Sequence, residues 1–249
     1  MTQLKDIQVA KGRISKYIKH TPLYPSTYFS KISNHHVYLK LENLQNTNAF
    51  KVRGASNYIL QIEPSVGKRG VITASSGNHG KAVAYVASRI GYPAEVVVPI
   101  DIILSKVKSI KDYGAEIIYW KKSTKERDEK AQQLAKDNEL IFIDSVDHPW
   151  LIEGQGTVGL EIIEDLPDVE AVLVPIGGGG LISGILLALK EKNPQVKIYG
   201  VEPTGSNSMY LSLQTGKLTE LKNINTIADG LRSTQPGSLA FTIVKKYVE

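Results

Sequence analysis

One lysine, Lys51, has neighbours that suit a reactive amine. It lies within residues 46–55, and Arg53 places a second positive charge two positions away. Burial and a neighbouring cation both lower the pKa of a lysine, and a neutral amine can attack a carbonyl to form a Schiff base. Thr47 and Asn48 are able to cap a helix that starts just after them. The segment therefore predicts a nucleophilic lysine near the start of a helix.

Four consecutive glycines follow one hydrophobic run and precede another: Gly177, Gly178, Gly179 and Gly180. The apolar pattern that begins at Leu181 has the length and composition of a helix. Backbone amides without side chains can converge on one point, and the helix N-terminus adds a partial positive charge. The pattern predicts a site for an anion such as phosphate, whereas the alternative is a tight turn whose glycines serve packing alone.

An acid after the next strand, Glu202, raises the alternative of a nicotinamide-nucleotide fold. It stands about 22 residues after Gly180, near the position of a ribose-binding acid. The glycine spacing does not match, because Ser183 or Ile182 occupies the place of the third glycine. A monophosphate is therefore favoured over a dinucleotide.

A second loop between a predicted strand and a predicted helix is polar, and it consists of Ser75, Ser76, Gly77, Asn78, His79 and Gly80. Such a loop offers main-chain donors for a carboxylate, together with hydroxyl and amide side chains. A serine-hydrolase elbow does not match, because no glycine stands two residues before either serine. The alternative here is a helix cap with a turn. With the lysine and the glycines, the loop favours pyridoxal phosphate as cofactor and an amino acid as substrate.

Short β-branched runs alternate with helical patterns along the chain. The predicted strands are residues 37–41, 70–74, 94–98, 116–120, 141–143, 171–176 and 197–201, and the predicted helices are 50–62, 81–90, 103–113, 124–138, 159–164 and 181–192. Strands separated by such helices pair in parallel through right-handed crossovers, and sites lie at their C-terminal ends. We expect an α/β protein of two open, mainly parallel, doubly wound lobes. Residues 1–69 and 146–249 would form a large lobe, and residues 70–145 a small mobile one.

The composition is that of a globular enzyme, with 249 residues, 42% hydrophobic and 22% charged. Apolar runs end well before the roughly 18 residues that a membrane span needs, and the N-terminus lacks a signal-peptide pattern. The absence of cysteine removes disulfides and thiolate metal sites. The net charge of +5 comes from lysines interleaved with acids and not with aromatic residues, which indicates a solvated surface and no nucleic-acid partner. We expect a cytoplasmic protein.

These motifs, in this order, resemble the threonine and serine dehydratases among the fold-type II pyridoxal-phosphate enzymes, a group similar to the β subunit of tryptophan synthase. Serine racemase and the threonine synthases are related to them. The resemblance runs through almost the whole chain, in residues 21–23, 39–45, 46–55, 75–80, 154–157, 177–181, 201–203 and 226–230. So many ordered motifs are specific for the fold and less so for the substrate.

The resemblance implies a role for each matching residue. Lys51 would form the Schiff base with the cofactor and take the α-proton of the substrate, and Phe50 would pack beside the cofactor ring. Asn78 would bind the ring hydroxyl, and the four glycines with Leu181 would hold the phosphate. The substrate would contact Ser75, Ser76, Gly77, Asn78, His79 and Gln155, with Ser76 as the acid/base on the opposite face in racemising relatives. The products from L-threonine would be 2-oxobutanoate and ammonia, as for an ammonia-lyase, with L-serine as a second substrate.

Two departures from the family pattern limit these expectations. A divalent cation is not expected, because Glu202 matches one ligand but Ser206 and Ser208 stand where further ligands would be. The pattern also ends before the last strands and helices of the family, so we expect an incomplete large lobe with exposed apolar surface, low stability or dependence on a partner chain. A homodimer or homotetramer is implied for the family. Serine racemase, serine dehydratase and a cofactor-binding remnant without turnover stay open as alternatives.

Overall fold

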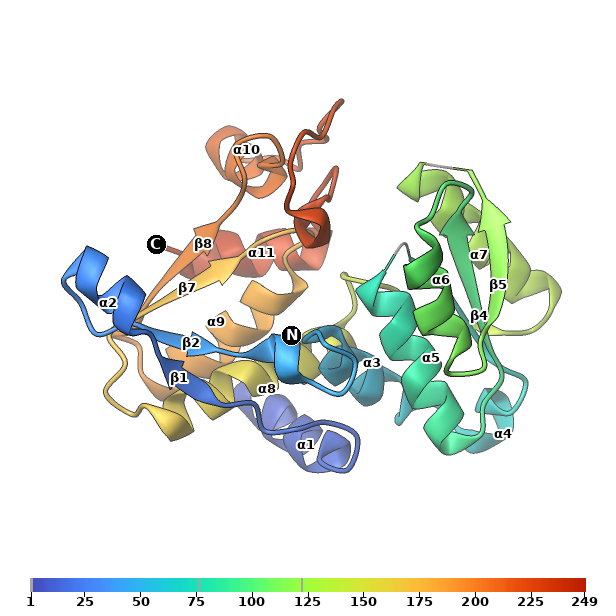
Figure 1. Ribbon diagram of the computed structural model, residues 1–249, viewed down its shortest axis with the longest axis horizontal. Coiled ribbons are helices and arrows are strands. Elements are labelled where there is room, and N and C mark those ends of the chain that lie inside the picture. The colour runs from blue at the N-terminus through green and yellow to red at the C-terminus, as the bar shows by residue number, and fades with distance from the viewer. Residues whose placement is uncertain (1, 76, 122) are drawn as a thin grey trace.

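The computed structural model describes residues 2–75, 77–121 and 123–249 (Figure 1). The strands are β1 (Leu23–Pro25), β2 (Tyr38–Lys40), β3 (Val71–Ala74), β4 (Ala94–Pro99), β5 (Glu116–Trp120), β6 (Ile141–Phe142), β7 (Ala171–Pro175) and β8 (Lys197–Val201). The helices are α1 (Leu4–Ile14), α2 (Thr27–Ser33), α3 (Lys51–Ile59), α4 (Pro64–Gly67), α5 (Asn78–Ile90), α6 (Leu104–Lys111), α7 (Thr124–Asp137), α8 (Pro149–Asp165), α9 (Gly180–Lys192), α10 (Ser208–Thr215) and α11 (Ser238–Tyr247). Two short 3-10 helices, η1 (Glu42–Leu44) and η2 (Asp229–Leu231), complete the elements.

The four central strands of the chain form a parallel sheet in the order β5-β4-β3-β6. Side chains of successive strand residues point to opposite faces, so Val96 packs with α5 while Val97 packs against Ala131 and Ala135 of α7. Helices α5 and α6 cover one face and α7 the other, as the right-hand part of Figure 1 shows. The predicted parallel, doubly wound α/β architecture is confirmed for this sheet.

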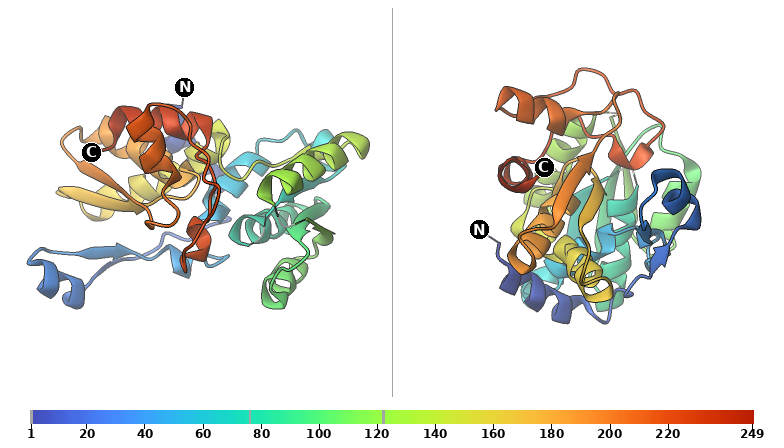
Figure 2. Two further views of the ribbon diagram at one scale, coloured as in Figure 1. Left: turned by 90° about the horizontal axis from the view of Figure 1, so that it is seen from above. Right: turned by 90° about the vertical axis from the view of Figure 1, so that its left-hand side faces the viewer.

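The remaining strands form two separate pairs. Strands β7 and β8 are parallel, and their inner face packs on α9 within a core that also contains α8. Strands β1 and β2 are antiparallel, which is an exception within the mainly parallel architecture that the sequence predicts. The connection between them does not act as a crossover, because α2 buries none of its residues against a sheet. Figure 2 shows this hairpin projecting from the body of the molecule.

Helix α8 is longer than the sequence predicts, since it begins ten residues before position 159, at Pro149. Its glycines allow close contact with two other helices. A Cβ on Gly154 would lie 2.5 Å from the carbonyl oxygen of Arg53 in α3, and a Cβ on Gly184 of α9 would lie 2.4 Å from the amide nitrogen of Gly156. Glycine weakens an isolated helix, and here the tertiary contact offsets that weakness.

Apolar side chains are exposed on the outer face of β7 and β8. Leu173 is 69% exposed, Tyr199 40% and Val201 46%. This surface agrees with the predicted exposed apolar area. No described helix is both long enough and apolar enough to cross a lipid bilayer.

Candidate active site

Helix α3 presents Lys51 as its first residue. The preceding residue, Phe50, already has helical backbone angles, and no side chain caps the helix. The predicted capping role of Thr47 and Asn48 is therefore wrong. Asn48 instead adopts a left-handed φ of 59°, and its amide donates to the carbonyl of Asn43, so it shapes the turn before the helix.

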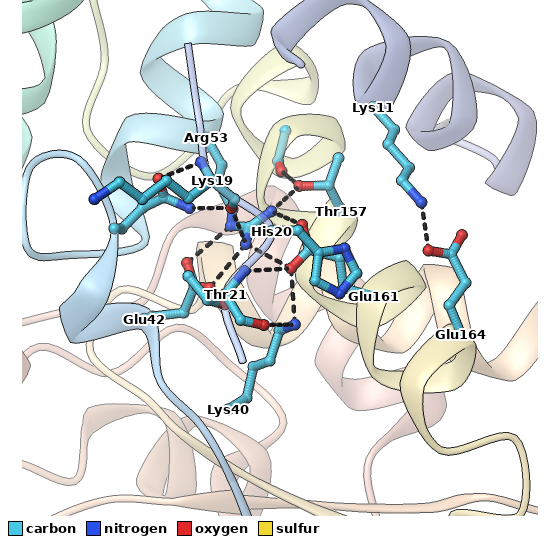
Figure 3. A network of polar contacts seen from close by, with 12 residues as sticks. Lys11, Lys19, His20, Thr21, Lys40, Glu42, Arg53, Thr157, Glu161 and Glu164 are labelled. Atoms are coloured by element: carbon cyan, nitrogen blue, oxygen red, sulfur yellow. Dashed lines mark hydrogen bonds and ion pairs between the residues drawn. The ribbon is translucent and has the colours of Figure 1, made fainter. Parts of the chain in front are cut away.

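A buried ion network fixes the same helix two residues later, at Arg53 (Figure 3). The guanidinium donates two hydrogen bonds to Glu42, both 2.8 Å, and two to Glu161, at 2.7 and 2.8 Å. Burial disfavours the charge of Arg53, but the bonds to both carboxylates outweigh it and raise its pKa. Glu161 also receives an ion pair from Lys40 at 2.8 Å. These forked contacts hold the start of α3 in one position.

The amine of Lys51 lies in a desolvated setting. Its Nζ donates to the carbonyl oxygen of Ser145 at 2.6 Å and lies 5.5 Å from the ring centre of Phe50. Burial lowers the pKa of Lys51 to about 8, and the negative charge of Asp144 partly opposes this shift. Arg53 is not the cause, contrary to the prediction, because its charge is matched by Glu42 and Glu161 on the other side of the helix start. The amine is thus far easier to deprotonate than a surface lysine.

Residues 144–147 connect Lys51 to the glycine loop, and we call them the connecting turn. Asp144 accepts hydrogen bonds from the backbone N–H groups of Val146 at 2.6 Å and Asp147 at 2.8 Å, which closes the turn. Val146 lies against the glycine loop, since its side chain would be 2.7 Å from a Cβ on Gly178. The connecting turn therefore contacts both the amine of Lys51 and the glycine loop.

The connecting turn also anchors α11. The carboxylate of Asp147 accepts from the backbone N–H groups of Ser238 at 2.9 Å, Leu239 at 2.9 Å and Ala240 at 3.2 Å. These are N–H groups of the first turn of α11, which have no partner inside their own helix. A negative charge at this end of a helix is also favoured by the helix dipole.

The glycine loop follows β7 and ends as α9 begins at Gly180, so Leu181 lies in the first turn of that helix. Gly179 has a φ of 97°, which side-chain-bearing residues rarely adopt, and a Cβ there would lie 2.9 Å from both Ala240 and Met209. Gly177 lies against η2, with a would-be Cβ 3.5 Å from the carbonyl oxygen of Gly230. The close neighbours of Gly179 leave no room for a side chain, whereas those of Gly177 are at ordinary van der Waals distance. The free N–H groups at the start of α9 suit an anion.

The polar loop lies between β3 and α5. The hydroxyl of Ser75 accepts from the N–H of Gly77 at 3.1 Å, and Asn78 is exposed as the first residue of α5. His79 is only 3% exposed, and neither ring nitrogen has a hydrogen-bond partner. Burial and the charge of nearby Lys51 lower the pKa of His79 to about 3, although the carbonyl of Ile143 opposes the shift. His79 is therefore a neutral side chain that lies near the carbonyl of Ile143, without a hydrogen bond of good geometry at either ring nitrogen. Ser76 lies outside the described residues.

These features fit a phosphate-bearing aldehyde. The amine of Lys51 suits the aldehyde, and the backbone of the loop from Gly177 to Leu181 suits the phosphate. The unpartnered nitrogens of His79 are the kind of buried polar atoms that a ligand satisfies. Lys51 and the loop from Gly177 to Leu181 could thus hold pyridoxal phosphate, and the roles of Phe50 and Asn78 toward it stay predictions.

Two other predicted site residues have structural contacts. Gln155 is buried between α8 and α3, where its amide nitrogen would lie 2.3 Å from a Cβ on Gly54, and its role toward a substrate stays a prediction. Glu202 accepts from the N–H groups of Met209 at 3.0 Å and Tyr210 at 2.7 Å, so it caps α10. The described part of the chain holds no group of three or more His, Cys, Asp or Glu side chains arranged for a metal ion.

The role of the connecting turn was not predicted from the sequence. A signal was present, because the polar run 144–147 directly follows the predicted strand 141–143, and the C-terminal ends of parallel strands are where sites form. The contacts themselves join residues far apart in sequence, with Lys51 and Ser145 separated by 94 positions. Spacing along the chain therefore does not reveal them.

Comparisons with known proteins agree with pyridoxal phosphate as the cofactor. Residues 14–249 match the family described as pyridoxal-phosphate dependent enzyme. An L-threonine ammonia-lyase of Thermotoga maritima is 42% identical over 249 residues, which is all of this chain and 62% of that protein. Among solved structures, maize serine racemase is 38% identical with a TM-score of 0.97, covering 100% of this chain and 75% of that one. The processed form of threonine deaminase isoform 2 from Solanum lycopersicum is 34% identical with a TM-score of 0.94, covering 99% and 71%. The chain therefore belongs to the family of pyridoxal-phosphate-dependent enzymes.

Proposed function

We propose that the protein is a threonine ammonia-lyase, also called threonine dehydratase, which converts L-threonine to 2-oxobutanoate and ammonia and also acts on L-serine. The observation that carries the proposal is the desolvated amine of Lys51, which lies near two loops that suit anions. The glycine loop, reached through the connecting turn, suits a phosphate, and the polar loop that contains His79 suits a carboxylate. The similarity to a threonine ammonia-lyase and to a threonine deaminase supports this substrate class. The chain spans 62% of the length of the first of these relatives.

Bound pyridoxal phosphate supplies a conjugated ring that accepts the electrons left at the α-carbon of the substrate. Lys51 would hold the cofactor through its amine and then take the proton from that carbon, for which a pKa of about 8 is close to the operating pH. The backbone donors of the loop from Ser75 to His79 would orient the substrate carboxylate. Ser76 would be the acid/base on the opposite face, and Gln155 a further substrate contact.

We further propose the division of the chain into a small lobe, residues 70–145, and a large lobe formed by residues 1–69 and 146–249. The four-stranded sheet falls within the first and the β7–β8 pair within the second. Movement of the small lobe toward the large one would exclude water from the site. We propose a cytoplasmic homodimer or homotetramer as the working form.

A second candidate function is that of a serine racemase or serine dehydratase, favoured by the similarity to maize serine racemase. The two functions differ in product, since racemisation returns serine of the opposite hand and dehydration releases ammonia. A third candidate is a protein that binds the cofactor without turnover.

The test begins with binding of pyridoxal phosphate to the purified full chain. An absorption band of the lysine-bound cofactor should form, and L-threonine should then yield 2-oxobutanoate. Lys51→Ala should abolish the band, whereas Lys68→Ala, which changes an exposed lysine, should leave it unchanged. Mass spectrometry after borohydride reduction would identify the modified lysine directly.

The outcomes separate the candidates. A band with 2-oxobutanoate supports the threonine ammonia-lyase. A band with D-serine from L-serine, and no product from threonine, supports the racemase, while a band without any product supports the cofactor-binding protein. A band that persists in Lys51→Ala would contradict all three.

A further inference from the structure

An ion pair joins the two walls of the candidate active site. Lys106 in α6 contacts the carboxylate of Asp229 in η2, with 2.5 Å between Nζ and Oδ2. The two residues are 123 positions apart in sequence. Lys106 is 29% exposed and Asp229 is 67% exposed. Within the described residues, this is the only hydrogen bond or ion pair between α6 and residues 166–249.

On one side, the pair contacts the polar loop. A Cβ on Gly77 would lie 4.0 Å from the Nζ of Lys106, so the charged group is beside the loop backbone. One helical turn further on, Ile110 packs below the same loop, with its Cδ1 3.5 Å from a would-be Cβ on Gly80. Helix α6, on the right of Figure 1, therefore supports the loop that would bind the substrate carboxylate.

On the other side, the pair belongs to a turn that supports the glycine loop. Asp229 begins η2, and the next two residues, Gly230 and Leu231, each place a backbone atom 3.5 Å from a would-be Cβ on Gly177. The turn is fixed in place because Ser206 donates a hydrogen bond to the carbonyl of Leu231 at 2.8 Å. A shift of Asp229 would therefore displace the backbone that contacts the glycine loop.

The part of the chain that carries the polar loop and the part that carries the glycine loop also contact each other away from this ion pair. The strongest packing between the small-lobe helices and the Lys51 segment is between α3 and α5. Contacts near Lys51 add to it, as where Lys81 donates to Asn48 at 3.1 Å. A polar contact placed at a second point restricts rotation about the first, even where its own energy is small.

We propose that Lys106 and Asp229 are positioning residues that set the spacing between the polar loop and the glycine loop, a proposal that rests on the function given above. The ion pair fixes the distance between the polar loop and the glycine loop. Its loss would leave each loop intact but would allow the distance between the two loops to vary.

Amide hydrogen exchange of the full chain loaded with pyridoxal phosphate tests this directly. Lys106→Met should raise exchange in residues 226–231, and Asp229→Asn should raise it in residues 75–80, each by about 2–5-fold, as expected for an exposed ion pair. Exchange rising in the opposite wall is the informative result, because a local defect would change only the mutated element. A charge-swapped pair, Lys106→Asp with Asp229→Lys, should restore the wild-type exchange.

The matched control is Lys108→Met, which removes an exposed lysine from the same helix. It should leave exchange in residues 226–231 unchanged. Turnover adds a second readout, in which KM for L-threonine rises about 2–5-fold in the Lys106 and Asp229 variants and is restored by the swap. Unchanged exchange in the opposite wall, or equal effects of Lys108→Met, would overturn the proposal. If threonine is not a substrate, the exchange data still decide it, since they need only bound cofactor.

Discussion

Replacing Asp144 by Asn should make the amine of Lys51 more reactive at neutral pH. Burial lowers the pKa of Lys51 to about 8, and the charge of Asp144 is the influence that opposes this shift. At a pKa of about 8, about a tenth of the amine is neutral at pH 7, whereas a further decrease of roughly one pKa unit makes this about a half. The amide oxygen of the new side chain can still accept the N–H groups of Val146 and Asp147, so the connecting turn should persist.

The assay follows the rate at which the protein captures pyridoxal phosphate as a function of pH. In the wild-type protein the rate should rise with pH and reach its midpoint near pH 8. In Asp144→Asn the midpoint should move down by roughly one pH unit, and the rate at pH 7 should increase about 5-fold. Borohydride reduction and peptide mass spectrometry would assign the captured cofactor to Lys51.

The control is Asp112→Asn, which removes the same charge from an exposed position at the end of α6. It should leave the midpoint in place, because exposed charges are screened by salt and water. A midpoint that moves upward in Asp144→Asn would refute the electrostatic account of the site. An equal shift in both variants would show that net charge, and not the position of Asp144, controls the amine.

Arg53→Met should lower the free energy of unfolding by about 3–5 kcal/mol, because Glu42 and Glu161 would lose their buried cationic partner. Arg69→Met, which breaks an exposed ion pair, should lower it by about 1 kcal/mol or less. Urea denaturation would measure both, and similar losses would contradict the argument. The pKa of Glu161 is lowered in the folded state, so its contribution to stability is present above pH about 4.5 and is lost as pH falls through the lower folded value. In Arg53→Met this loss on acidification should shrink or reverse, and an unchanged pH dependence would argue against the ion network. Gly184→Ala should destabilise the protein by about 1–3 kcal/mol or more, because its Cβ would clash with α8. Gly12→Ala in α1, where no atom lies near the added Cβ, should stabilise the protein by up to about 1 kcal/mol. Melting temperatures that change in the same direction in both variants would contradict the packing account.

The sequence was informative where local pattern and structure coincide. Strand β4 and its neighbours were predictable, because β-branched runs between helical patterns leave few other arrangements. The glycine loop was predictable for the same reason, since it combines a strand end, a helix start and four glycines in one segment. The N-terminal part of α8 was not, because its glycines favour a helix only when α3 and α9 are packed against them.

The electrostatics of the site were only partly predictable. The direction of the Lys51 pKa shift agrees with the sequence argument, but the cation held responsible, Arg53, is neutralised by Glu42 and Glu161. Which charges face one another depends on tertiary contacts across 11 and 108 positions of the chain. A cation two residues away in sequence is therefore a weak guide to the field at an amine.

The connecting turn also has a consequence for the order of events during synthesis. The carboxylate of Asp147 finds its backbone partners in Ser238, Leu239 and Ala240, which follow it by 91, 92 and 93 residues. Translation at roughly 5–20 residues per second separates these positions by roughly 5–20 s. During this interval Gly179 also lacks its contact with Ala240. The phosphate cradle should therefore mature only after α11 has left the ribosome, so that cofactor capture should follow the synthesis of α11.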